Sequence, residues 1–82
     1  MPVFRRIPQF NETLSAREIE VLTLFSDGLG YAEIGARLFI APVTVKTHMV
    51  RIGMKLGSRN RAHSVKLGLR KGYIPLDEPV QP

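Results

Sequence analysis

Hydrophobic residues recur at intervals of three and four along most of this chain, which is the spacing of an amphipathic α-helix. The first such stretch begins after Ser15 and ends before Asp27, and the others cover residues 31–38, 42–56 and 61–71. Turn-forming residues at 27–30 separate the first stretch from the second, and turn-forming residues at 57–60 separate the third from the fourth. The pattern predicts an all-α fold of four helices.

The first helix has a clear start signal. Ser15 and Glu18 form an S-x-x-E capping box, and Leu14 and Ile19 occupy the staple positions on either side of it. One face of the helix is hydrophobic and consists of Ile19, Leu22 and Phe25, with Val21 and Leu24 beside them. We therefore expect this helix to be packed scaffold.

Residues 31–56 contain two helices separated by a short break. Gly35 weakens the first of them by up to about 1 kcal/mol relative to Ala, but it lets a neighbouring helix approach closely, which suits the crossing inside a helix-turn-helix. Pro42 suits the first position of the next helix, where its missing N–H costs nothing. A short helix, a tight turn at 39–41 and a basic helix are the arrangement that places one helix in the major groove of DNA.

The third helix has two different faces. At about 100° per residue, its core stripe consists of Val45, Met49, Ile52 and Leu56. The opposite arc carries Val43, Thr47, Val50, Arg51 and Met54, flanked by Thr44, Lys46 and Lys55. Methyl groups, a hydroxyl and cations suit a groove floor, where thymine methyls and guanine acceptors need partners. The alternative is a sparsely polar surface helix.

The fourth helix begins after residues that can cap it, with Asn60 preferred over Ser58. One of its stripes is formed by Ala62, Val65, Leu69 and Tyr73, and an adjoining smooth stripe by Ser64, Gly68 and Gly72. Small residues four apart permit close packing, either against the first helix or against a second copy of the protein.

Charge is unevenly distributed along the chain. The formal net charge is +5, and between Glu33 and Asp77 there are nine cations and no acid. Such asymmetry is typical of a protein that binds a polyanion. The alternative is a solvated basic surface.

Composition excludes several kinds of site. Without Cys, the chain has neither disulfides nor thiolate metal ligands. His48 and His63 are too far apart for a helical metal pair; we expect His48 to pack and His63 to face solvent. No catalytic constellation is present, so we expect neither an enzyme nor a cofactor. No apolar run approaches the roughly 20 residues that cross a bilayer, which predicts a cytoplasmic protein.

We expect one domain with a tail at each end. Residues 1–12 hold two prolines and no hydrophobic period, which predicts a flexible arm, and residues 75–82 form a loose tail around the domain at 13–74. The chain has no room for a sensor or receiver domain as well. It is either a stand-alone protein, which the start at Met1 favours, or the end of a longer regulator.

Several segments together match a known pattern. They are Leu14-Ser15-x-Arg17-Glu18-x-Glu20-Val21-Leu22, Gly28 with Glu33-Ile34, Thr44-Val45-Lys46-Thr47-His48, Ile52-x-x-Lys55-Leu56-Gly57, Arg61 and Gly72-Tyr73-Ile74. Over about residues 13–74 the chain resembles the LuxR-type (GerE-type) helix-turn-helix. The resemblance implies a four-helix domain whose third helix enters the major groove and whose fourth helix pairs two copies over a pseudo-palindromic site.

Carried over by position, the resemblance implies three groups of contacts. The base contacts would be Lys46, Thr47, Val50 and Arg51. The phosphate contacts would be Thr44, Lys55 and Arg61, with Lys46 beside them; an ion pair within the fold is the alternative role of Lys55. The dimer interface would comprise Ala62, Val65 and Leu69.

Some positions depart from the family pattern. Gly30 and Ala41 stand where Ser or Thr usually precedes the second and third helices, and the hydroxyl missing at Ala41 should cost about 0.5–2 kcal/mol. Arg51 stands where Asn is common and adds a charge beside the bases. Gly53 replaces a bulky residue, and we expect it to soften or bend the third helix.

The leading hypothesis is a transcriptional regulator that binds double-stranded DNA in a sequence-specific manner as a homodimer. As an activator it would also contact RNA polymerase. One alternative is a sigma-factor (region-4-like) promoter reader, which shares the run at residues 28–34 but usually ends near its third helix. The other is a small decoy that pairs with full-length regulators through the fourth helix and blocks them.

Overall fold

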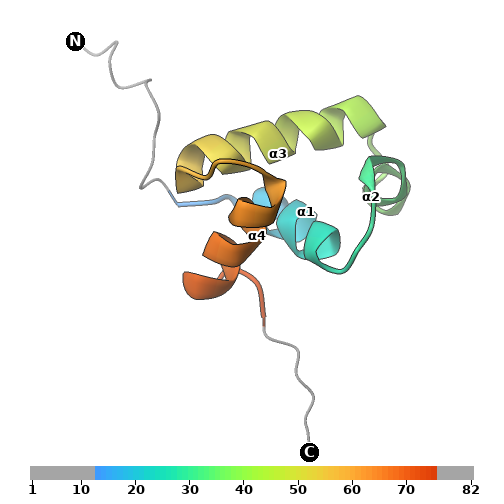
Figure 1. The fold of residues 1–82 in the computed structure, drawn as a ribbon. Coiled ribbons are helices and arrows are strands. Elements are labelled where there is room, and N and C mark those ends of the chain that lie inside the picture. Colours follow the sequence, from blue (N-terminus) through green and yellow to red (C-terminus); the bar gives the residue numbers. More distant parts are fainter. Residues whose placement is uncertain (1–12, 76–82) are drawn as a thin grey trace, which may run out of the picture.

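Residues 13–75 are described in the computed structural model and contain four helices and no strand (Figure 1). They are α1 (Ala16–Ser26), α2 (Tyr31–Leu38), α3 (Pro42–Leu56) and α4 (Arg61–Arg70). The all-α prediction is confirmed, as are the bounds of α2 and α3, while α4 ends one residue earlier than expected. Among these residues no helix is long and apolar enough to cross a membrane. The predicted arm and the tail beyond Pro75 lie outside the described residues.

Side-chain oxygens cap two of the helices. The Ser15 Oγ atom accepts a hydrogen bond from the Glu18 N–H at 3.2 Å, and Glu18 Oε1 accepts one from the Ser15 N–H at 2.8 Å. This reciprocal pair confirms the predicted capping box, which satisfies N–H groups that the helix itself leaves without partners. Asn60, rather than Ser58, caps α4 by accepting from the His63 N–H at 2.9 Å.

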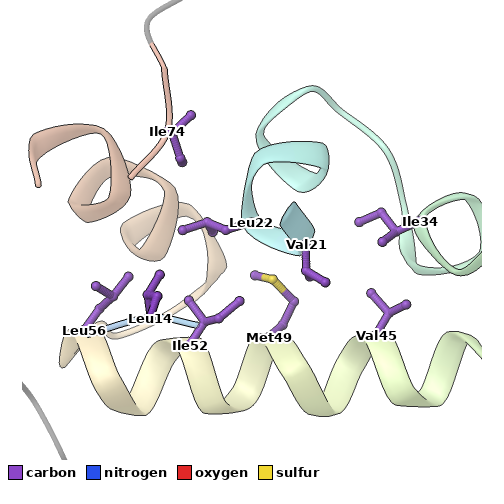
Figure 2. Close-up of a cluster of buried hydrophobic side chains, with 9 residues drawn as sticks. All are labelled: Leu14, Val21, Leu22, Ile34, Val45, Met49, Ile52, Leu56 and Ile74. Carbon is purple, nitrogen blue, oxygen red and sulfur yellow. The ribbon is translucent and has the colours of Figure 1, made fainter. Parts of the chain in front are cut away.

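The core lies where α3 crosses the other helices, and Figure 2 shows its nine buried hydrophobic side chains. The cluster comprises Leu14, Val21, Leu22, Ile34, Val45, Met49, Ile52, Leu56 and Ile74. Four of these come from α3 and are the predicted core stripe. Because burying each such side chain contributes roughly 1.5–3 kcal/mol, the stripe fixes the rotation of α3 about its own axis.

Close packing of α4 against α1 depends on Gly68. A Cβ atom at this buried position would lie 2.8 Å from Leu22 Cδ2 and 2.8 Å from Ile74 Cδ1, which is closer than carbon atoms approach. Ser64, one turn earlier on α4, is also buried. Ser64 and Gly68 therefore pack within the domain, as one of the two alternatives predicted, whereas Gly72, the third member of the predicted smooth stripe, lies beyond the end of α4 and is exposed.

An ion pair joins the start of α1 to the end of α3. Lys55 Nζ donates to Glu18 Oε1 at 2.8 Å, and the Glu18 side chain is only 4% exposed. Burial raises the pKa of this carboxyl, but the hydrogen bonds from Lys55 and from the Ser15 N–H outweigh that effect, and the pKa is lowered from its ordinary value of 4.5. Glu18 thus serves the cap and the ion pair with the same oxygen.

We predict that Glu18→Gln lowers the free energy of unfolding by about 1–3 kcal/mol at pH 7, because Lys55 loses its charged partner. Glutamine can still complete the capping box, so the ion pair alone is removed. The pKa of Glu18 is lower in the folded state than in the unfolded state. The stability that the ionised Glu18 contributes is therefore present above pH 4.5 and is lost as the pH falls through its folded-state pKa. Urea unfolding of both proteins between pH 3 and 7 measures this difference.

Glu20→Gln is the matched control, since Glu20 is an exposed carboxylate that pairs with Arg17 at 3.3 Å. An exposed pair contributes little, so this variant should unfold almost as the wild type does. A Glu18→Gln difference that stays constant down to pH 3 would contradict the assigned charge state.

Candidate nucleic-acid interface

The side of α3 that faces away from the core is exposed along the helix. Its exposed residues are Val43, Lys46, Thr47, Val50, Arg51 and Met54. Val50, at the middle of this face, is 56% exposed although Val is among the residues most often buried. All four residues predicted to contact bases belong to this face, which we call the outer face of α3.

Thr47 offers a restricted set of contacts. Its hydroxyl donates to the carbonyl of Val43 at 3.0 Å, one turn back along the helix. With the proton committed there, the Thr47 oxygen remains an acceptor and its methyl group remains available for apolar contact. These are the contacts that an amino group or a thymine methyl on a base edge can use.

The N-terminus of α3 is held by the backbone. Ala41 has no side-chain oxygen to act as a cap, and the Ala41 carbonyl accepts from the Thr44 N–H at 2.9 Å. Pro42 occupies the first helical position, as predicted. Thr44 itself is half-buried, so less of its surface is open than at the neighbouring Val43.

The turn between α2 and α3 combines a close approach with an unusual backbone conformation. A Cβ atom at Gly35 would lie 2.5 Å from the carbonyl oxygen of Ile40, so the tight return of the chain requires glycine. The close approach at Gly35 is therefore made mainly by the turn, together with the first residue of α3, and not by the body of a neighbouring helix as predicted. Phe39 adopts φ 60° and ψ 43°, the left-handed conformation, and is 91% exposed. This geometry carries the chain directly from α2 into α3.

Two cations with the same predicted role have different surroundings. Lys55 pairs with Glu18 between α1 and α3, so the structure supports the ion pair that the sequence left open as its alternative role. Arg61, the first residue of α4, is exposed and donates from Nη1 to the hydroxyl of Tyr31 at 2.9 Å. The partnership with Tyr31 was not predicted, because the two residues lie 30 positions apart and share no local pattern.

A hollow of about 740 Å³ lies beside the outer face of α3. It is lined by residues of α3 between Lys46 and Met54, the α3–α4 connection, Tyr31 and the start of α4. Three cations reach it, Lys46, Arg59 and Arg61, and no acid is present among the described residues that line it. The hollow thus continues the outer face of α3 as a basic groove.

Gly53 is one of the α3 residues that line this groove. A Cβ atom there would lie 3.2 Å from the Oγ atom of Ser58, whose hydroxyl is 2.6 Å from that of Ser64. α3 continues through Gly53 to Leu56 without a break. The absent side chain therefore enlarges the groove and leaves room for the two hydroxyls.

The outward side of α4 carries the predicted dimer residues. Ala62 is exposed, Leu69 is 41% exposed, and Val65 is half-buried against the core. Because Ser64 and Gly68 face inward, this stripe is the apolar surface that α4 leaves open.

One of the two histidines lies as expected and the other does not. His48 is half-buried, as a packing residue would be, and its Nδ1 atom has no hydrogen-bond partner within residues 13–75. His63 was expected to face solvent, but it is half-buried and its Nδ1 atom accepts from the Arg59 N–H at 3.0 Å. It therefore holds the α3–α4 connection. Within the described residues no group of His, Cys, Asp or Glu could hold a metal ion.

Comparison with known proteins identifies the family. Residues 12–67 match the model of the bacterial regulatory proteins of the luxR family. The chain is 47% identical over 61 residues to the probable transcriptional regulatory protein NarL of Mycobacterium tuberculosis, and 40% identical over 61 residues to the oxygen regulatory protein NreC of Staphylococcus aureus. Each match covers 74% of this chain and 28% of the relative.

A solved structure shows the same fold. The response regulator ChrA of a heme-sensing two-component system superposes with a TM-score of 0.73 and 39% sequence identity, over 87% of this chain and 35% of ChrA. The chain therefore belongs to the LuxR family of bacterial regulatory proteins and contains its helix-turn-helix, DNA-binding domain. It spans little more than a quarter of the length of the curated relatives it matches.

We predict that Phe39→Gly raises the free energy of unfolding by about 1 kcal/mol, because glycine adopts the left-handed conformation without the steric penalty of a Cβ atom. Little packing is lost, since the Phe39 ring is almost fully exposed. Ala36→Gly, at an exposed position inside α2, is the control and should lower stability by about 1 kcal/mol. Urea unfolding of the wild type and the two variants measures these differences. Equal destabilisation by Phe39→Gly and Ala36→Gly would contradict the prediction.

Proposed function

We propose that this chain regulates transcription by placing α3 in the major groove of double-stranded DNA. The observation that supports it is the outer face of α3, where methyl groups, a hydroxyl acceptor and two cations stand exposed directly after a helix-turn-helix bend. A helix of this kind fits the major groove, whose edges present thymine methyls and guanine acceptors. Since DNA is the proposed partner, we place the protein in the cytoplasm.

The outer face of α3 divides into chemically distinct contacts. Arg51 can donate two hydrogen bonds to guanine O6 and N7, and the Val50 methyls suit the methyl group of thymine. Thr47 contributes its methyl group and an acceptor. Lys46, which also lines the basic groove, is placed to meet a base edge or the adjacent phosphate.

The phosphate contacts come from the borders of this face. Thr44 and Arg61 remain in the proposed set, whereas Lys55 is left out because its ammonium is bound to Glu18. Such contacts are independent of sequence, supply most of the affinity and make binding sensitive to salt.

We further propose that two copies pair through α4, using Ala62, Val65 and Leu69. The support is the apolar stripe that α4 leaves exposed while its smooth stripe packs on α1. A two-fold dimer reads two half-sites about one helical turn apart. Contact with RNA polymerase follows from the resemblance and stays a prediction.

The two alternatives have less support. A sigma-factor promoter reader is disfavoured by α4, which packs against α1 and α3, and by the match to the LuxR family. A decoy that pairs only with other regulators would not need exposed cations beside a helix-turn-helix bend. Selection of bound sequences from a pool of random duplexes at two salt concentrations separates the proposed regulator from a decoy. A decoy would yield no sequence motif, and its binding would depend little on salt.

We predict that Lys46→Ala weakens binding to all duplexes and lowers the slope of log K against log salt by about one, since one phosphate contact is lost. Val50→Ala should instead change the preference at one base pair, by roughly 1–3 kcal/mol, with the salt slope unchanged. Fluorescence anisotropy titrations of matched and mismatched duplexes measure both effects.

Arg17→Ala is the control for Lys46→Ala, because Arg17 is an exposed cation on α1 that pairs with Glu20. It should leave both affinity and salt slope close to those of the wild type. If Lys46→Ala and Val50→Ala bind as the wild type does, the placement of α3 in the groove is wrong.

We predict that Leu69→Arg prevents pairing of two copies, because it places a charge in the apolar stripe of α4. Sedimentation equilibrium should show monomers, and cooperative binding to two half-sites about one turn apart should disappear. Lys66→Ala, an exposed neighbour on α4, should retain both properties. Cooperative binding by Leu69→Arg would refute the assignment of this surface.

A further inference from the structure

Arg61 is held in one orientation by two aromatic rings and a hydroxyl. Its guanidinium carbon lies 5.6 Å from the centre of the Tyr31 ring and 6.0 Å from that of Phe25. The two rings are themselves stacked, with their centres 6.4 Å apart and their planes inclined by 27°. The two distances from the guanidinium carbon are within the range of cation–π attraction. The hydrogen bond from Nη1 to the Tyr31 hydroxyl orients the guanidinium group.

This arrangement stands at the edge of the basic groove. Tyr31 and Arg61 line it together with Lys46 and Val50 of α3. A DNA strand that runs past the outer face of α3 therefore passes the Tyr31–Arg61 pair. The first residue of α2 and the first residue of α4 meet at this point, although α2 and α4 are separated in the chain by α3.

We propose that Tyr31 and Arg61 form a single binding site for one phosphate of that strand. The inference rests on the proposed placement of α3 and adds Tyr31, which no family position or sequence motif assigned, to the DNA contacts. It also assigns Arg61 an oriented contact with one phosphate, where the sequence indicated only a positive charge near the DNA backbone.

The hydrogen-bonding inventory of the pair supports this role. Arg61 donates one N–H to Tyr31 and keeps its other N–H groups for a phosphate oxygen. The Tyr31 oxygen accepts that bond and retains its own O–H, which a phosphate oxygen can accept. Donation by a cation to the phenol oxygen makes the remaining O–H a stronger donor, so the two residues act cooperatively.

Preorganisation is the second contribution of Tyr31. An arginine side chain loses considerable rotamer freedom when it is fixed on a ligand. The rings of Tyr31 and Phe25 have already restricted Arg61 in the free protein. Binding a phosphate therefore requires less additional ordering than it would at an unsupported surface arginine.

The test is a double-mutant cycle on a fluorescent duplex of random sequence, titrated at several salt concentrations. Arg61→Ala should weaken binding about fivefold to tenfold and lower the salt slope by about one. Tyr31→Phe, which keeps the ring but removes the hydroxyl, should weaken binding about threefold to fivefold. The double variant should bind about as weakly as Arg61→Ala alone, because the two residues share one phosphate.

Arg61→Lys keeps the charge and loses the planar fork. The Arg61→Lys variant should retain the salt slope of the wild type. Adding Tyr31→Phe to Arg61→Lys should weaken binding less than Tyr31→Phe weakens binding by the wild type. Tyr73→Phe is the matched control, since its hydroxyl accepts from the Leu14 N–H at 3.4 Å and Tyr73 lies outside the basic groove. Circular dichroism melting of each variant verifies that the fold is retained.

A scan with methylphosphonate duplexes locates the phosphate. Neutralising one particular phosphate should weaken binding by the wild type but have little effect on Arg61→Ala. Additive losses in the double variant, or unchanged binding by Tyr31→Phe, would overturn the shared site and leave the placement of α3 intact. Absence of any salt-dependent binding by the wild type would overturn both proposals.

Discussion

Burial of one side of α3 is the constraint on which the remaining structure depends. Val45, Met49, Ile52 and Leu56 are enclosed by the other helices, and turning α3 about its axis would bring some of these four side chains out of the core. The exposure of the opposite side is a consequence of this rotation. Val43 and Val50 are therefore open to solvent because the neighbouring residues of α3 fill the core. The proposed contact with thymine methyl groups would use this exposed face.

The packing that orients α3 relies on missing side chains at two crossings. At Gly35 the chain turns back so closely that a Cβ atom would overlap the carbonyl of Ile40. At Gly68 a Cβ atom would lie 2.8 Å from the ends of the Leu22 and Ile74 side chains. Because the interior is closely packed, a methyl group at Gly35 would force the backbone of the α2–α3 turn to move, and one at Gly68 would force either the Leu22 and Ile74 side chains or α4 to move. Displacement of α2 would move the start of α3, and displacement of α4 would move Arg61 away from the groove.

Much of the fold could be predicted because its determinants are local. The capping box at Ser15, the Pro42 start and the three-and-four spacing of the α3 core all lie within a few residues of the features they specify. Contacts between distant segments could not be obtained in this way. The packing of Ser64 and Gly68 against the rest of the domain and the pairing of Tyr31 with Arg61 depend on which helices meet, and sequence periodicity contains no information about that.

Lys55 and Arg61 show why charge alone is an incomplete guide to a DNA-binding surface. Both are cations in a region without acids between Glu33 and Asp77, and both occupy positions that the family pattern associates with phosphate. Lys55 is bound to a carboxylate whose charge it neutralises, and moving it to a phosphate would leave the buried Glu18 carboxylate without a charged partner. Arg61 is held by a neutral hydroxyl and two aromatic rings, which orient it and leave its charge uncompensated. A cation held in this way keeps its attraction for phosphate, so the chemical nature of the supporting partner separates the cations that stabilise the fold from those available to DNA.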